Sequence, residues 1–194
     1  MNSLNAYVDN AKNYLNTHKT VKSWLSTVGI VVVAMVAMWI VMSCFIFCSV
    51  VQSGSMENTL FKGDYVIAPR VHPLSMVTPK RGDVVFFKWR SDPFHVYVKR
   101  IIGMPGDRVI ISGNNVMVND KVLKEPYAKG TMKPKGSSIW HVPDGKYFVL
   151  GDNRNNSADS RFATDVYVDF NNILACRGVD FSMKGVKLLS ANKQ

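Results

Sequence analysis

The chain has 194 residues, and its 24 lysine and arginine residues against 14 acidic residues give a formal net charge of +10 at pH 7. This length suits one modest domain and an anchor rather than two full domains. The three cysteines exclude a disulfide framework and a cysteine-rich zinc site. The basic residues lack zinc-finger or basic-zipper spacing, so we expect no nucleic-acid partner.

The first segment, residues 1–27, is basic and precedes the most hydrophobic part of the chain. Lys12, Lys19 and Lys22 stand against a single acid, Asp9. A short positive flank of a membrane span stays in the cytoplasm. We therefore expect a cytoplasmic N-terminus.

Residues 28–51 form an apolar run without charge or proline. As a helix, about 24 residues extend about 36 Å, enough to cross a hydrocarbon core of about 30 Å. Two alternatives stay open: a buried core helix, and a cleaved signal peptide, whose apolar region is usually shorter. We predict a single transmembrane helix, which places the following domain on the periplasmic or extracytoplasmic side.

Residues 52–194 carry short runs rich in β-branched and aromatic residues, bounded by Gly, Pro, Asn or Asp, which is typical of strands. We predict a mostly β fold: an antiparallel β-sheet domain behind the single N-terminal helix, with a small accessory hairpin region at about 107–146. Residues 124–140, rich in Gly, Pro, Lys and Ser, are predicted to be an exposed loop. The predicted strands are 64–71, 83–89, 95–103, 107–113, 115–120, 121–127, 146–152 and 185–189.

Ser53, Gly54 and Ser55 directly follow the apolar run. A serine hydroxyl is a poor nucleophile unless a base removes its proton. Three histidines after the anchor are candidate bases, but the GxSxG nucleophile motif is absent. A Ser-His-Asp arrangement therefore has no motif support; its candidate histidines are His72, His95 and His141.

Lys99 is the other candidate base. Strand alternation places it on one face with Tyr97 and Ile101. Spacing alone favours an edge-strand lysine that discourages aggregation. The alternative is a lysine buried by its neighbours, because burial disfavours the ammonium form. At a pKa of about 10.4 a lysine near pH 7.4 is neutral about once in a thousand molecules, and lowering the pKa by about 3 units would cost about 4 kcal/mol.

Four motifs in order resemble the boxes of bacterial type I signal peptidases (leader peptidases). They are SGSM at 53–56, RGDVVFFK at 81–88, YVKRIIGMPGD at 97–107 and GDNRNNSADSR at 151–161. The match covers most of residues 50–180, and four boxes behind an anchor are highly specific. The family has a largely β protease domain that lies on the membrane surface.

The resemblance implies a Ser/Lys dyad, with Ser55 as the nucleophile and Lys99 as the general base. The Ser55 backbone N–H and the Ser53 hydroxyl would form the oxyanion hole. Ser157 would hydrogen-bond to the Lys99 amine and orient it.

The resemblance also implies supporting and substrate-binding residues. Asp159 and Arg161 would pair to hold the loop of the last box, and Arg100 would pair with Asp152. Shallow pockets for the small residues before the cut would be lined by Val51, Tyr97 and Val98.

Some positions depart from the family pattern. Gln52 stands where many members have proline, one membrane span is visible where some members have two, and Cys176 has no partner for the disulfide found in some members. These departures concern accessory contacts rather than the dyad.

By this resemblance the chain is a membrane-bound serine endopeptidase that cleaves signal peptides from exported preproteins through an acyl-enzyme. Its partners would be preproteins with Ala-x-Ala-like cleavage sites and membrane lipid. It would need neither a metal nor an organic cofactor. We expect a single-pass protein of the bacterial inner (cell) membrane. Two alternatives stay open: a peptidase dedicated to one pilin or conjugation substrate, and a non-enzymatic anchored β domain.

Overall fold

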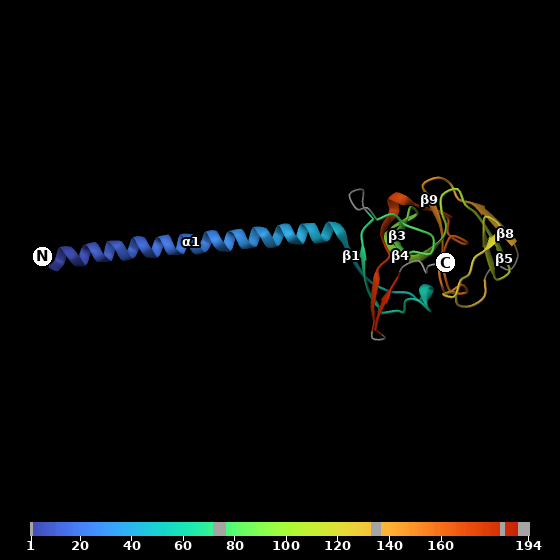
Figure 1. Ribbon diagram of the computed structural model, residues 1–194, viewed down its shortest axis with the longest axis horizontal. Coiled ribbons are helices and arrows are strands. Elements are labelled where there is room, and N and C mark those ends of the chain that lie inside the picture. The colour runs from blue at the N-terminus through green and yellow to red at the C-terminus, as the bar shows by residue number, and fades with distance from the viewer. Residues whose placement is uncertain (1, 72–76, 133–136, 183–184, 190–194) are drawn as a thin grey trace. The chain divides into compact units, whose positions relative to one another are not determined.

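A computed structural model describes residues 2–71, 77–132, 137–182 and 185–189. The chain divides into two compact units, Met1–Cys44 and Phe45–Gln194. The first unit consists of helix α1, and the second contains the β strands (Figure 1).

Helix α1 runs from Asn2 to Phe45. Among the described residues it is the one helix long and apolar enough to cross a membrane, with a mean hydropathy of 2.6 over its most apolar window. The predicted range, 28–51, differs from it at both ends. The helix begins earlier because no proline interrupts the preceding residues. It ends earlier because Ile46–Val50 form strand β1, whose backbone pairs with another strand.

The strands confirm the predicted mostly antiparallel β fold and form three sheets. Every pairing between named strands is antiparallel. The central sheet has the order β10 (Val168–Asp169), β9 (Lys146–Leu150), β4 (Asp92–Gly103), β3 (Val84–Trp89) and β11 (Ile173–Cys176). Strands β3 and β4 thus lie inside the sheet, and five of the six residues of β3 are buried.

A second sheet, which we call the β1 sheet, contains the strand that follows α1. Its order is β1 (Ile46–Val50), β2 (Tyr65–Pro69), β12 (Val179–Ser182) and β13 (Gly185–Leu188). Its inner face packs through Phe47, Val66 and Ala68 on Val84 and Phe86 of the central sheet. This packing fixes the end of β1, from which the chain leads into the short 3₁₀ helix η1 (Gly54–Met56).

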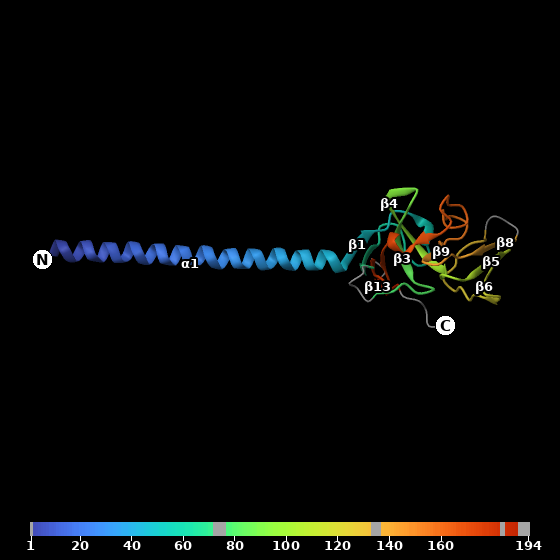
Figure 2. The same cartoon turned by 90° about the horizontal axis from the view of Figure 1, so that it is seen from above.

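The third sheet, the accessory sheet, has the order β7 (Lys121–Val122), β6 (Asn115–Val118), β5 (Arg108–Ser112) and β8 (Ser137–His141). It is larger than the predicted hairpin, because β8 falls at the end of the segment predicted to be a loop. Residues 133–136 of that segment lie outside the described residues. Figures 1 and 2 show the accessory sheet and the β1 sheet at opposite ends of the second unit.

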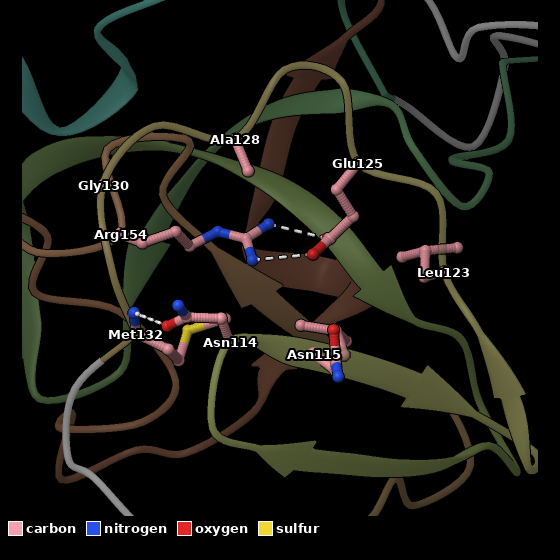
Figure 3. Close-up of a pocket in the computed structure, with 9 residues that line it drawn as sticks. Asn114, Asn115, Leu123, Glu125, Ala128, Gly130, Met132 and Arg154 are labelled. Atoms are coloured by element: carbon pink, nitrogen blue, oxygen red, sulfur yellow. Dashed lines mark hydrogen bonds and ion pairs between the residues drawn. The ribbon is translucent and has the colours of Figure 1, made fainter.

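A segment that we call the strap, residues 125–130, ties the accessory sheet to the chain after β9. Arg154 donates two hydrogen bonds to Glu125, at 2.8 and 2.7 Å (Figure 3). Lys129 forms a parallel bridge with Asn153. The arginine side chain is 2% exposed and the glutamate side chain 9%. The strap is therefore fixed against the GDNR motif by a buried ion pair and by backbone hydrogen bonds.

Candidate active site

Ser55 lies in η1, the short 3₁₀ turn that follows strand β1 in the chain. The residue is 7% exposed, and Met56 beside it is fully buried in the core. Asn153 holds this turn from the other side: its backbone N–H donates to the Ser55 carbonyl at 3.0 Å, and its Nδ2 donates to the Gly54 carbonyl at 3.0 Å. The serine is thus held by burial of the next side chain and by two hydrogen bonds to carbonyl groups of the turn.

Lys99 reaches Ser55 from the middle of the central sheet. It lies on β4, opposite Val85 of β3, and is 3% exposed. Its Nζ lies 2.7 Å from Ser55 Oγ and 2.9 Å from the Val98 carbonyl oxygen. The sequence-based edge-strand interpretation is therefore wrong, because β4 has neighbours on both sides.

Burial changes the protonation of this amine. Removal of the ammonium group from water lowers the pKa of Lys99 to about 8, although the negative charges of Asp159 and Asp152 oppose the shift. An amine with a pKa of about 8 is neutral in about one molecule in five near pH 7.4. The unprotonated amine is a base within hydrogen-bonding distance of a hydroxyl.

Ser53 also lies close to the dyad. Its hydroxyl is 3.3 Å from Ser55 Oγ, and its backbone is extended ahead of η1. A hydroxyl and a backbone N–H on one short turn are suitable donors for an oxyanion. The arrangement can therefore serve an attack by Ser55 on a carbonyl carbon.

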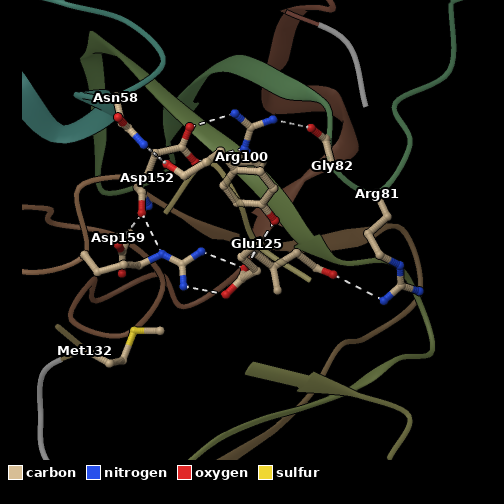
Figure 4. Close-up of polar contacts among 12 residues, drawn as sticks. Asn58, Arg81, Gly82, Arg100, Glu125, Met132, Asp152 and Asp159 are labelled. Atoms are coloured by element: carbon tan, nitrogen blue, oxygen red, sulfur yellow. Dashed lines mark hydrogen bonds and ion pairs between the residues drawn. The ribbon is translucent and has the colours of Figure 1, made fainter. Parts of the chain in front are cut away.

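Both expected ion pairs are present and buried. Arg100 donates from Nε and Nη2 to Asp152, at 2.9 and 2.6 Å (Figure 4). Thr59, four residues after the candidate nucleophile, donates to the same carboxylate at 2.5 Å. Because Arg100 is the neighbour of Lys99 on β4, its bonds to Asp152 and to Thr59 join the strand of Lys99 to the segment that follows Ser55.

The second pair stabilises the loop of the last motif. Arg161 donates to both oxygens of Asp159 at 2.8 Å, and both side chains are fully buried. The Gly151 N–H also donates to Asp159, at 3.0 Å. These bonds close the loop from Gly151 to Arg161 on itself.

The expected hydrogen bond from Ser157 to Lys99 is absent. Ser157 Oγ is buried and has no hydrogen-bond partner among the described residues. A side-chain carbon at Gly151 would lie only 2.1 Å from this oxygen, so the hydroxyl packs against that glycine. The Lys99 amine is oriented instead by Ser55 and the Val98 carbonyl.

Only two of the three predicted substrate-binding residues lie together. Val51 is buried in the core below the β1 sheet, and Val98 packs on the same cluster. Tyr97 packs on a different cluster, beside Phe87, and donates its hydroxyl to Asp92 at 2.7 Å. Val98 is the next residue on β4, and its side chain points to the opposite face of the strand from that of Tyr97. This alternation separates Tyr97 from Val51 and Val98.

The histidines do not form a competing site among the described residues. His95 is largely exposed and contacts Asp92. His141 is exposed on β8. His72 lies outside the described residues.

Sequence reasoning missed how the nucleophile turn is held. Asn153 belongs to the GDNR motif, but nothing in its spacing shows that its amide reaches Gly54. Glu57 accepts from the same amide at 3.2 Å and from Lys129 of the strap at 3.1 Å. These contacts join residues far apart in the chain, and the sequence carried no signal for them beyond the motif itself.

Comparison with known proteins gives one family and several relatives. The family model described as signal peptidase, peptidase S26, matches residues 22–178. A probable signal peptidase I-2 of Synechocystis is 41% identical over 117 residues, which cover 58% of this chain and 53% of that protein, so the chain spans about half the length of this relative. A signal peptidase I of Bacillus subtilis subsp. natto is 35% identical over 142 residues, 68% of this chain and 75% of that protein.

A solved structure also matches. The crystal structure of a signal peptidase I from Enterococcus faecalis V583 is 29% identical, covers 51% of this chain and 96% of its own, and has a TM-score of 0.44.

Proposed function

The chain belongs to the signal peptidase S26 family, and from this premise we propose that it is a membrane-anchored serine endopeptidase that cleaves signal peptides from exported preproteins. The observation that carries the proposal is the 2.7 Å distance between Lys99 Nζ and Ser55 Oγ at a buried position. A serine becomes a nucleophile when a neutral base accepts its proton. Burial of Lys99 provides that base without a histidine.

In the first half of the reaction, the neutral Lys99 amine accepts the Ser55 proton as Oγ attacks the scissile carbonyl carbon. The Ser55 N–H and the Ser53 hydroxyl donate to the oxyanion that develops. Lys99, now protonated, donates its proton to the leaving amine. The C–N bond breaks, the mature protein leaves, and the signal peptide remains as an ester on Ser55.

In the second half, a water molecule replaces the leaving amine. Lys99 accepts a proton from this water, which attacks the ester carbonyl carbon. The oxyanion donors act again, and the proton returns to Ser55 Oγ as the C–O bond breaks. The signal peptide leaves as a free acid, and the dyad is restored.

The residues before the cut would contact the apolar surface of Val51 and Val98. Both valines belong to one apolar cluster, in which Val51 is buried and Val98 is partly exposed. Contact with this cluster would suit the small apolar residues of Ala-x-Ala-like cleavage sites, which the family resemblance implies. Tyr97 would not contact these residues, because it packs on a different cluster.

The β1 sheet supports a membrane location for the catalytic unit. Register pairs Val50 with Tyr65, Tyr65 with Phe181, and Phe181 with Val186, so one exposed apolar row crosses all four strands. An exposed apolar face of this extent is typical of a membrane or protein contact. We assign it to lipid, because β1 directly follows the helix that is apolar enough to span a bilayer. The basic residues before the apolar part of α1 support a cytoplasmic N-terminus, because a short positive flank of a membrane span stays in the cytoplasm.

The test is incubation of the purified protein in detergent with several unrelated preproteins, followed by N-terminal sequencing of the products. We expect one cut in each, after an Ala-x-Ala-like sequence. Cleavage of one substrate alone would favour a dedicated peptidase. No cleavage of any preprotein would refute the proposed function.

A further inference from the structure

A groove of about 1060 Å³ lies beside the accessory sheet and takes no part in the proposed chemistry. Its lining combines apolar residues of the β6–β7 hairpin and the strap with three cations. The cations are Arg81, Lys121 and Lys124, and no acidic residue lines the groove. A peptide or other ligand of complementary charge would therefore be acidic.

The two lysines are free to bind such a ligand. Lys121 and Lys124 are exposed, and among the described residues neither side chain has a hydrogen bond or ion pair. Arg81 donates to Asp107 at 2.9 Å and is partly exposed. A smaller cavity of about 220 Å³ does not offer such a cation from its arginine, because Arg154 is already paired with Glu125 (Figure 3).

The β6–β7 hairpin that lines the groove is held by its turn conformation and by side-chain hydrogen bonds. Asn119 and Asp120 adopt left-handed backbone conformations, with φ of 50° and 64°, as a tight hairpin turn requires. The Asn119 side chain accepts from the Arg108 N–H and donates to Asp107. These bonds hold the hairpin from which Lys121 projects.

One wall of the groove connects to the nucleophile turn. The Tyr127 ring lines the groove and lies over the Arg100 guanidinium, 4.0 Å from its Cζ. The Tyr127 carbonyl accepts from Asn58 Nδ2 at 3.1 Å, and Asn58 is three residues after Ser55. Figure 4 shows Asn58, Arg81, Gly82 and Arg100 along this connection. These contacts join one wall of the groove to the segment that follows Ser55.

We propose that this groove binds an acidic, extended segment of the preprotein beyond the cleaved bond, in the part that becomes the mature protein. The inference rests on the proposed function. A peptide fits better than a lipid headgroup, because the accessory sheet lies at the opposite end of the catalytic unit from the apolar face of the β1 sheet (Figures 1 and 2). The apolar lining would contact aliphatic parts of the segment, and the lysines its carboxylates.

The test uses the double variant Lys121→Gln/Lys124→Gln and two preproteins that differ only after the cut, one with acidic residues and one with their amides. The KM for the acidic preprotein should rise roughly threefold to tenfold, since exposed ion pairs contribute modestly, and kcat should not change. The difference in KM between the wild type and the double variant should become smaller at high salt, because salt screens exposed charges. The matched control, Lys62→Gln/Lys146→Gln, removes two charges outside the groove and should leave KM unchanged.

An equal effect on both preproteins, or no effect on either, would overturn the proposal. A second measurement is independent of cleavage: anisotropy of a fluorescent acidic peptide with the Ser55→Ala variant in detergent. Binding that weakens in the double lysine variant would support the groove even if no preprotein were cut, in which case the proposed function alone would fail. Lysine-dependent binding of phosphatidylglycerol vesicles without binding of the peptide would assign the groove to lipid and refute the inference.

Discussion

Lys99 Nζ lies 2.7 Å from Ser55 Oγ although 44 positions separate the two residues in the chain. The lysine comes from an interior strand, and the serine from a short turn that is fixed by Met56 and Asn153. This contact between a buried amine and a hydroxyl is the basis of the proposal that Ser55 is the nucleophile and Lys99 its base.

Ser55→Ala and Lys99→Met should each reduce kcat by more than about 10³-fold, because one removes the nucleophile and the other the base. The methionine keeps the apolar stem, so the fold should persist. Cleavage assays in detergent measure the loss, and circular dichroism melting is the control. A folded variant that still cuts at a rate near that of the wild type would contradict the dyad.

Asn153→Ala should lower kcat about tenfold with little change in the pH dependence, because it removes the donor that holds the Gly54 carbonyl and leaves the base intact. Steady-state kinetics at several pH values measure both. Asn156→Ala, at an exposed position on the same loop, is the matched control. If kcat is the same in both variants, Asn153 does not position the turn.

Asp159→Ala should destabilise the catalytic unit by about 3–5 kcal/mol, because it leaves the Arg161 guanidinium buried without its carboxylate. Urea unfolding of the purified protein measures the change. Asp120→Asn breaks an exposed pair with Arg108 and should change the free energy of unfolding by less than about 1 kcal/mol. Equal effects in the two variants would rule out a special role for the buried pair.

Asp180 should make stability depend on pH. Burial raises the pKa of this carboxyl, the nearby charge of Asp64 raises it further, and Lys187 opposes the shift. Because the folded pKa lies above the unfolded value, the stabilising contribution is present at low pH and is lost as pH rises through the folded pKa. Asp180 Oδ1 also has no hydrogen-bond partner in the part of the chain that the structure describes.

Asp180→Asn should therefore raise the free energy of unfolding at neutral pH by roughly 1 kcal/mol and lose this advantage below about pH 4. Thermal melts across this range, with Asp144→Asn at an exposed turn as the control, measure the effect. A variant less stable than the wild type at neutral pH would show that the carboxylate has a stabilising partner.

The sequence predicted the β fold, which the structure confirms, and it proposed Ser55 and Lys99 as a dyad, but through different signals. Short β-branched runs identified most strands, whereas β1 was hidden in a continuous apolar run whose periodicity cannot separate helix from strand. Lys99 was assigned through motifs, since strand alternation alone favoured an exposed edge. Its place between β3 and β9 depends on pairings that are not local in the chain.

The contacts of individual polar side chains were harder to predict. The pairs of Arg100 with Asp152 and Arg161 with Asp159 are present as expected. The bond from Ser157 to Lys99 is not, because the Ser157 hydroxyl packs on Gly151. A motif indicates which residues lie near a site. Whether two of them form a hydrogen bond depends on side-chain rotamers and on donor–acceptor distances to within tenths of an ångström, which the order of residues does not encode.

The most direct test of the central claim is the pH dependence of kcat/KM for preprotein cleavage, which reports the pKa of the base in the free enzyme. The account predicts that kcat/KM rises about tenfold per pH unit at low pH and levels off above a midpoint of about 8, the pKa of buried Lys99. A midpoint near 6.5 would indicate a histidine base, and one near 10.4 a lysine in water; either result would contradict the account.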